Sequence, residues 1–125
     1  MKSAPALLPI FLVVVAGSAF AQEGDAERGR ALFQRQCGSC HQVASTRNTA
    51  GPTLQGVMGR PAGAVDGYRY SSALKGSGIM WSRETLDTYL ANPSAMVQGT
   101  RMALRIANEA HRRDIIEFLA ASMEK

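Results

Sequence analysis

One segment of this sequence, Cys37-Gly38-Ser39-Cys40-His41, carries the side chains best suited to chemistry. Two thiols three positions apart lie about one helical turn from each other, so both can face the same edge of a planar group. His41 follows at once, four residues after Cys37, and can place an imidazole nitrogen on a metal at that edge. Paired thiols with this spacing add to the vinyl groups of a porphyrin, and the next histidine binds its iron. The segment therefore predicts one covalently attached c-type haem.

Three other uses of this segment are compatible with its residue types. A thioredoxin-like redox pair would follow a strand and open a helix, whereas Cys37 and Cys40 close a helical pattern. A structural zinc ion needs four ligands, and the chain adds only His41 and the distant His111 to its two cysteines. A disulfide is possible but leaves His41 unexplained. We favour haem attachment because the motif is specific and the sequence indicates export.

Helical periodicity places the segment at the end of one helix and predicts three further helices. The predicted helices run from Ala26 to about Gln36, from Ser72 to Lys75, from Arg83 to Ala91 and from Glu109 to about Met123. A residue that commonly caps helices precedes each of them, namely Asp25, Ser71, Ser82 and Asn108. The intervening loops are long, and no strand is predicted. Such loops are uncommon in a small domain unless a bound group, such as a haem, organises them.

The beginning of the chain has the features of an export signal. Lys2 precedes an apolar run from Ala6 to Ala16, and Ala19-Phe20-Ala21 is a small-x-small cleavage site. We expect residues 1–21 to be a cleavable signal peptide and residues 22–125 to form a single domain. The apolar run is too short for a comfortable membrane span, although an uncleaved segment would tether the domain to a membrane.

The composition fits a small domain that takes part of its stability from a bound group. The chain has 125 residues and a formal net charge of +4. Its basic residues are scattered and form no stripe interleaved with aromatic residues, so we expect no nucleic-acid partner. A domain of this size has a thin core, and a porphyrin would add apolar surface to it. In an oxidising compartment a lone cysteine pair normally forms a disulfide, unless another reaction such as thioether formation consumes it.

Motifs along almost the whole predicted domain resemble class I cytochrome c, in the branch of mitochondrial cytochrome c and bacterial cytochrome c2. In chain order the motifs are Gly29…Phe33…Cys37-x-x-Cys40-His41, Gly51-Pro52-x-Leu54-x-Gly56, Gly59-Arg60, Gly67-Tyr68-x-Tyr70-Ser71, Trp81, Leu86-x-x-Tyr89-Leu90-x-Asn92-Pro93, Gly99-Thr100-x-Met102 and Arg112-x-x-Ile115-x-x-Phe118-Leu119. The haem pentapeptide alone indicates the superfamily, and the ordered remainder makes the branch specific.

The resemblance implies the all-α cytochrome c fold, in which three main helices and short ones wrap around one covalently bound haem. The first and last helices would cross, with Gly29 and Phe33 meeting Phe118. Met102 would be the second axial ligand of the iron. Met96 is its main rival, six residues away in the same loop.

The resemblance also implies roles for the residues around the haem. Pro52 would accept a hydrogen bond from His41, the usual support for a histidine that binds a metal. The buried propionates would be bound by Arg60, Tyr70 and Trp81. Tyr89 and Thr100 would lie beside the Met102 sulfur.

An iron with two protein ligands has no open position for a substrate, so we expect an electron carrier and not an enzyme. The resemblance implies a soluble, monomeric, periplasmic monohaem carrier that docks transiently at its haem edge. Its partners would be respiratory or photosynthetic complexes: a quinol–cytochrome c reductase, a cytochrome oxidase or a reaction centre. The alternatives are a dedicated haem c subunit or partner of a periplasmic dehydrogenase, and a peroxidase or gas sensor with an open iron site.

Two departures from the family pattern have consequences. The family usually has a proline before the glycine of the methionine loop, and here that residue is Gln98. We expect a looser loop and an iron–sulfur bond that is easier to replace. The predicted domain also has only two lysines, Lys75 and Lys125, although Arg101 is a basic residue at a position where the family also has one. We therefore expect weaker electrostatic steering and a small, partly apolar docking interface.

Overall fold

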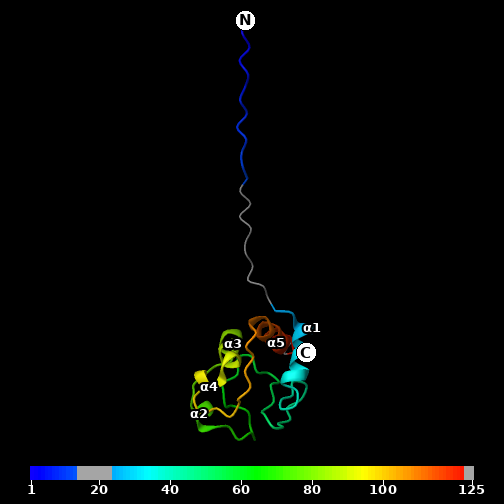
Figure 1. The fold of residues 1–125 in the computed structure, drawn as a ribbon, viewed down its shortest axis with the longest axis vertical. Helices are drawn as coiled ribbons and strands as arrows, with labels where there is room; N and C mark the ends of the chain where they lie inside the picture. Colours follow the sequence, from blue (N-terminus) through cyan, green and yellow to red (C-terminus); the bar gives the residue numbers. More distant parts are fainter. Residues whose placement is uncertain (14–23, 123–125) are drawn as a thin grey trace.

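The computed structural model describes residues 1–13 and 24–122, and its folded part is helical. Its helices are α1 (Ala26–Gln36), α2 (Ser72–Lys75), α3 (Arg83–Ala91), α4 (Pro93–Met96) and α5 (Glu109–Ala121) (Figure 1). Within the described ranges, extended pairing is limited to one isolated antiparallel bridge between Pro61 and Met80. The predicted all-α architecture is confirmed, with long loops wrapped between the helices.

The four predicted capping residues all cap helices. The side chains of Asp25, Ser71, Ser82 and Asn108 accept hydrogen bonds from backbone N–H groups of the first helical turn. Each of these bonds satisfies a donor that a helix start otherwise leaves without a partner. The last helix ends at Ala121, slightly earlier than predicted, and Met123 lies outside the described residues.

The short helix α4 was not predicted. Asn92 ends α3, as expected, but its side chain also accepts a hydrogen bond from the backbone N–H of Ala95. Pro93 then occupies the first turn of α4, where its fixed backbone angle suits a helix and its missing N–H has no helical acceptor. One Asn-Pro pair therefore closes one helix and opens the next.

The crossing of α1 and α5 is the main helix–helix contact of the fold (Figure 1). Gly29 lies directly against the backbone of α5, and a Cβ atom added there would overlap the carbonyl group of Asp114. The rings of Phe33 and Phe118 meet with their centroids 5.3 Å apart. The predicted crossing is thus present, with Phe33 against Phe118 as expected. The nearest neighbours of Gly29 are backbone atoms of Asp114 and Ile115.

The hydrophobic core lies between the α1–α5 pair and α3. It includes Leu32 from α1, Leu86 from α3 and Ile115 from α5, and loop residues such as Val57 and Ile106 complete it. Among the helices that the structure describes, none is long and apolar enough to cross a membrane. The predicted cleavage site after Ala21 lies outside the described residues.

Candidate functional site

The end of α1 brings the three side chains of the pentapeptide together. The backbone N–H of Cys37 bonds to the carbonyl of Phe33 at 2.8 Å, which closes the helix. The N–H groups of Cys40 and His41 then bond to the carbonyl of Cys37 at 3.1 and 2.9 Å. This tight turn keeps both cysteines and the histidine within one turn of chain, as their spacing predicts. Cys37 is buried and Cys40 is exposed, and no disulfide joins them.

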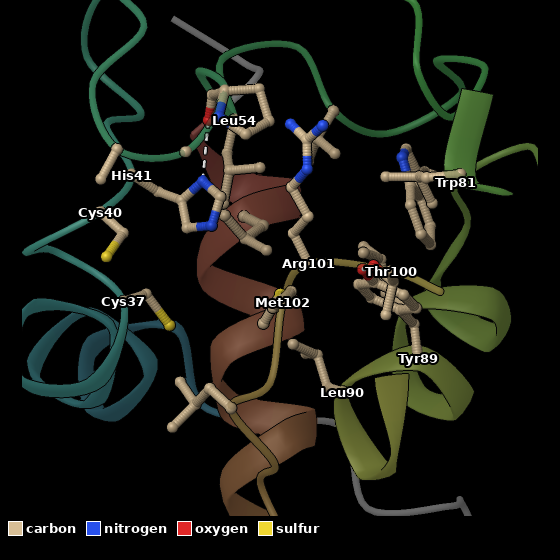
Figure 2. A pocket seen from close by; sticks show the side chains of 18 of the residues that line it. Cys37, Cys40, His41, Leu54, Trp81, Tyr89, Leu90, Thr100, Arg101 and Met102 are labelled. Carbon is tan, nitrogen blue, oxygen red and sulfur yellow. Dashed lines mark hydrogen bonds between the residues drawn. The ribbon is translucent and has the colours of Figure 1, made fainter. Parts of the chain in front are cut away.

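The imidazole of His41 is held in place by contacts with Gly51 and Pro52. Its Nδ1 lies 2.8 Å from the backbone carbonyl oxygen of Pro52, the predicted hydrogen bond (Figure 2). A carbonyl can only accept, so Nδ1 carries the proton and Nε2 keeps a free lone pair. A Cβ atom added at Gly51 would overlap the same ring. Burial lowers the pKa of His41, the charge of Arg60 lowers it further, and the bond to Pro52 opposes both effects. The ring is therefore kept neutral, with Nε2 available to a metal.

A cavity of about 440 Å³ lies beside this turn. All ten site residues predicted from the sequence line it: Cys37, Cys40, His41, Pro52, Arg60, Tyr70, Trp81, Tyr89, Thr100 and Met102. In Figure 2 the thiol of Cys37 and the imidazole of His41 enter from the side of α1, whereas Trp81 and Tyr89 enter from the side of α3. The remaining walls are largely apolar, with Leu90 and Ile115 among them. The cavity thus combines two thiols, one imidazole and one thioether in a mainly apolar space.

The thioether comes from the Met102 loop, which we define as residues 97–105. Among the methionines that the structure describes, only Met102 lines the cavity. Its rival Met96 packs against the core without reaching the cavity wall, and Met80 is 51% exposed. The hydroxyl groups of Tyr89 and Thr100 share a hydrogen bond of 2.5 Å, which fixes the loop to α3 two residues before Met102.

The rings of Trp81 and Tyr89 pack with their centroids 5.1 Å apart and form one wall of the cavity. Burial raises the pKa of Tyr89, and its hydrogen bond to Thr100 opposes that effect. The phenol of Tyr89 therefore stays neutral at this wall of the cavity.

Arg60 supplies a half-buried positive charge at another wall of the cavity. Its two terminal nitrogens donate to the backbone carbonyls of Thr53 and Gln55 at 2.9 and 3.0 Å. Its Nε is buried and has no hydrogen-bond partner among the described residues. Burial lowers the pKa of Arg60, and the nearby Tyr70 opposes that effect. A buried donor without an acceptor costs free energy, so this wall is suited to an anionic group such as a carboxylate.

The electrostatics of the thiols argue against a redox pair. Reactive cysteines in Cys-x-x-Cys pairs have lowered pKa values. Burial instead raises the pKa of Cys37 to about 11, and the neighbouring Cys40 adds to the effect. A zinc site is also disfavoured, because no three His, Cys, Asp or Glu side chains in the described ranges gather closely enough to bind a metal ion. The donor set fits a porphyrin held by two sulfurs, with a carboxylate-bearing edge near Arg60.

Several cavity residues were given no role from the sequence alone. Gly51 makes room for the ring of His41, and its position before a proline was the only signal of this. Tyr68 and Arg101 also line the cavity, but their side chains bond to backbone carbonyls far away in the chain. Leu104 lines the cavity and is 41% exposed. A pattern search does not reveal partners of this kind, since every residue has a carbonyl.

The family model described as Cytochrome c matches residues 26–122. The chain belongs to the cytochrome c family. Cytochrome c type-1 of Ascaris suum is 42% identical over 104 residues, which are 82% of this chain and 93% of the relative. Cytochrome c2 of Rhodomicrobium vannielii is 44% identical over 110 residues, 86% of each chain. The solved structure of cytochrome cH from Methylobacterium extorquens superposes with a TM-score of 0.73 at 41% identity, and covers 78% of this chain and 99% of its own.

Membership of this family settles the class of cofactor and activity. Cytochromes c carry one electron on an iron-containing haem c that is covalently bound, and they are electron carriers, not enzymes. The predicted resemblance to class I cytochrome c, the predicted fold and the predicted cofactor are therefore confirmed.

Proposed function

We propose that Cys37 and Cys40 form the thioether bonds to the haem and that His41 and Met102 are the axial ligands of its iron. The observation that carries this assignment is the convergence of two thiols, an oriented imidazole and one thioether on a single cavity. Nε2 of His41 is free to bind because Nδ1 is paired with Pro52. Met102 is favoured over Met96 because it alone of the two lines the cavity.

The other predicted site residues have distinct tasks in this proposal. Arg60, Tyr70 and Trp81 bind or neutralise the propionates, and the buried Nε of Arg60 gains an acceptor. Tyr89 and Thr100 hold the Met102 loop against α3. When bound, haem iron alternates between the ferrous and ferric states and so takes up and releases one electron. The neutral thioether favours the ferrous state, and two protein ligands leave no open position for a substrate.

The absorption spectrum of the oxidised protein tests the axial assignment. We expect a long-wavelength sulfur-to-iron band that Met102→Ala abolishes. Met96→Leu is the matched control, since it removes a thioether from a residue close to the same loop, and it should keep the band. Loss of the band in Met96→Leu, with its retention in Met102→Ala, would reverse the assignment. The mass of the purified mature protein reports the covalent haem and cleavage after Ala21 together.

We infer that the chain is a soluble periplasmic carrier between membrane electron-transfer complexes. The predicted export signal supports the compartment. A quinol–cytochrome c reductase as donor, and an oxidase or reaction centre as acceptor, follow from its likeness to carriers such as the cytochrome c2 of Rhodomicrobium vannielii. A dedicated subunit of a periplasmic dehydrogenase would instead purify with its partner.

The rim of the cavity supports a docking surface with little charge. Residues that are exposed and also line the cavity include Cys40, Ala50, Ala103 and Leu104, with Arg101 as the charged exception. A rim with one charged residue gives weak steering, so association depends on a small apolar contact. We expect the rate of reduction by a purified quinol–cytochrome c reductase to vary little with salt. A steep fall of that rate with salt would contradict this surface.

A pair of variants locates the contact. Leu104→Ala removes apolar area from the rim and should slow the bimolecular rate severalfold, about the effect of losing 1 kcal/mol of interface contact. Met80→Ala is the matched control, because Met80 is another exposed large apolar residue, 51% exposed, that does not line the cavity. An equal effect of the two variants would rule out a contact centred on Leu104.

A further inference from the structure

One turn of the chain contacts both segments that carry the proposed axial ligands. We call residues 67–71 the Tyr68 turn. The hydroxyl of Tyr68 donates a hydrogen bond of 2.9 Å to the backbone carbonyl of Ala50. The guanidinium of Arg101 donates a hydrogen bond to the backbone carbonyl of Arg69 in the same turn. These contacts join residues 18 and 32 positions apart in the sequence, and both reach a segment that lines the cavity.

Each end of this connection is next to a ligand. Ala50 precedes Gly51, which lies against the ring of His41 and whose N–H bonds to the carbonyl of Cys40 at 2.7 Å. Arg101 directly precedes Met102. A shift of Ala50 therefore moves the support of the histidine, and a shift of Arg101 moves the methionine.

The turn between the two ends is itself braced. The rings of Tyr68 and Tyr70 pack edge-on with their centroids 4.8 Å apart. The Tyr70 hydroxyl accepts a hydrogen bond of 3.1 Å from the backbone N–H of Val65. A second bond to the histidine side runs from the amide of Asn48 to the carbonyl of Asp66, at 3.0 Å. Because these contacts restrict the turn, a displacement at one of its ends is transmitted to the other end.

We propose that the Tyr68 turn is a strap that couples the His41 side of the cavity to the Met102 side, with Tyr68 and Arg101 as positioning residues. Removing the hydrogen bond at either end of the strap increases the mobility of the segment at the other end. The coupling keeps the His41 segment and the Met102 segment at a fixed separation, which would help both side chains to hold the iron of a bound haem. This inference rests on the proposed axial assignment for its effect on the iron, although the coupling itself concerns only the chain.

Amide hydrogen exchange in the holoprotein tests the coupling directly. Arg101→Leu removes the donor on the methionine side and should speed exchange of the Gly51 amide on the histidine side about threefold. Tyr68→Phe removes only a hydroxyl and should speed exchange of the Thr100 amide about twofold, because the Asn48 bond remains. Both factors lie at the low end for one hydrogen bond, since water competes at the surface. Arg101→Lys keeps a donor and should restore the slow exchange of Gly51.

Two matched variants control for loss of charge and loss of a hydroxyl. Arg105→Leu is the control for loss of charge, because Arg105 lies in the Met102 loop and its guanidinium donates to the carbonyl of Ala91. Thr88→Val is the control for loss of a hydroxyl, because the Thr88 hydroxyl donates to the carbonyl of Glu84 on the exposed face of α3. Neither residue lines the cavity, and neither variant should change exchange of Gly51. If Arg101→Leu and Tyr68→Phe each change exchange only on their own side, the strap is refuted.

Binding of imidazole to the ferric protein gives a second measurement. Because imidazole must displace the methionine sulfur, its dissociation constant reports how firmly Met102 is held. We expect Tyr68→Phe, which removes a hydroxyl that bonds to Ala50 on the histidine side, to lower that constant about twofold. An unchanged constant, with exchange of Thr100 also unchanged, would overturn the proposal. Absence of the sulfur-to-iron band in the wild-type protein would instead overturn the axial assignment, and the exchange experiment would still decide the strap.

Discussion

The α1–α5 crossing and the Met102 loop hold their positions by different kinds of contact. At the crossing, backbone lies on backbone at Gly29 and aromatic rings interlock, so the two helices share a buried surface. The loop contains the buried residue Val97, and the buried Ile106 follows it, but the loop is tied down mainly by single hydrogen bonds, such as the one between Tyr89 and Thr100. The pentapeptide follows α1 directly and takes its rigidity from the crossing.

This difference separates two tasks. A close-packed contact resists displacement because any movement creates overlap or a void. Hydrogen bonds from a loop to its surroundings exchange with water at modest cost. In the proposed assignment, the covalent attachment therefore lies on the rigid part of the fold, and the thioether of Met102 lies on the adjustable part.

The largest expected effect comes from filling the space at Gly29. On helix propensity alone, Gly29→Ala would stabilise α1 by about 1 kcal/mol. The overlap of the new Cβ with the carbonyl of Asp114 should reverse the sign and lower the free energy of unfolding by about 2 kcal/mol. Denaturant unfolding of the holoprotein measures this. Ala31→Gly, at an exposed position of the same helix, is the control and should cost about 1 kcal/mol. A more stable Gly29→Ala protein would mean that the crossing is not close-packed.

The next effect concerns the buried carboxylate at the same crossing. Asp114 accepts hydrogen bonds from the backbone N–H of Asp25 at 2.7 Å and from Nε of Arg28 at 3.1 Å. Burial alone would raise the pKa of Asp114, but these two bonds and the charge of Arg28 together hold it below its usual range. Asp114→Asn keeps an acceptor but loses the charge, and we expect a loss of about 1 kcal/mol at neutral pH, because Arg28 is largely exposed.

The lowered pKa of Asp114 also fixes the direction of a pH effect. A carboxyl whose pKa is lower in the folded state contributes its stabilisation above its unfolded pKa, about 3.9, and loses it as the pH falls through the folded value. We expect the stability difference between wild type and Asp114→Asn to be constant above about pH 5 and to shrink below pH 4. Unfolding curves across this range measure it. A difference that grows in acid would contradict the assignment.

An effect of similar size is expected where the loop meets α3. Tyr89→Phe removes the hydroxyl that bonds to Thr100 and should cost about 1 kcal/mol of unfolding free energy. The matched change Thr100→Val removes the other partner. Because each variant breaks the same bond, the double variant should cost less than the sum of the two single ones. Additive losses would show that the bond contributes little and that the loop is held elsewhere.

The smallest effect tests whether the loop can be stiffened. Val97 has extended backbone angles, φ −130° and ψ 91°, and so lies outside the α-helical region that a following proline disfavours. Gln98→Pro should therefore be accepted and stabilise the protein by about 0.5 kcal/mol by restricting the unfolded chain. We expect it to raise the midpoint pH of the alkaline ligand exchange, followed through the sulfur-to-iron band. An unchanged midpoint would count against a loop loosened by Gln98.

The features that were predictable from the sequence depend on local patterns. Asp25 and Ser82 were recognisable because a cap bonds within its own first turn, and Cys37 with His41 because their spacing sets their geometry. The cavity could be anticipated only through the resemblance, which supplied the roles of Arg60 and Met102. Contacts that end on a backbone carbonyl, such as those of Tyr68 and Arg101, left no sign, since any residue can provide the acceptor. The packing of Gly29 on Asp114 could not be predicted in this way, because it depends on the angle at which α1 and α5 cross. The sequence of one helix does not determine that angle.

Asn92 is both the C-cap of α3 and the N-cap of α4. Asn92 is the single residue between α3 and α4. The direction in which the chain leaves α3 is therefore set by the backbone and side chain of one residue, and with it the starting point of the Met102 loop. An insertion at this position would separate two functions that one residue now performs, and it would reorient the chain that follows.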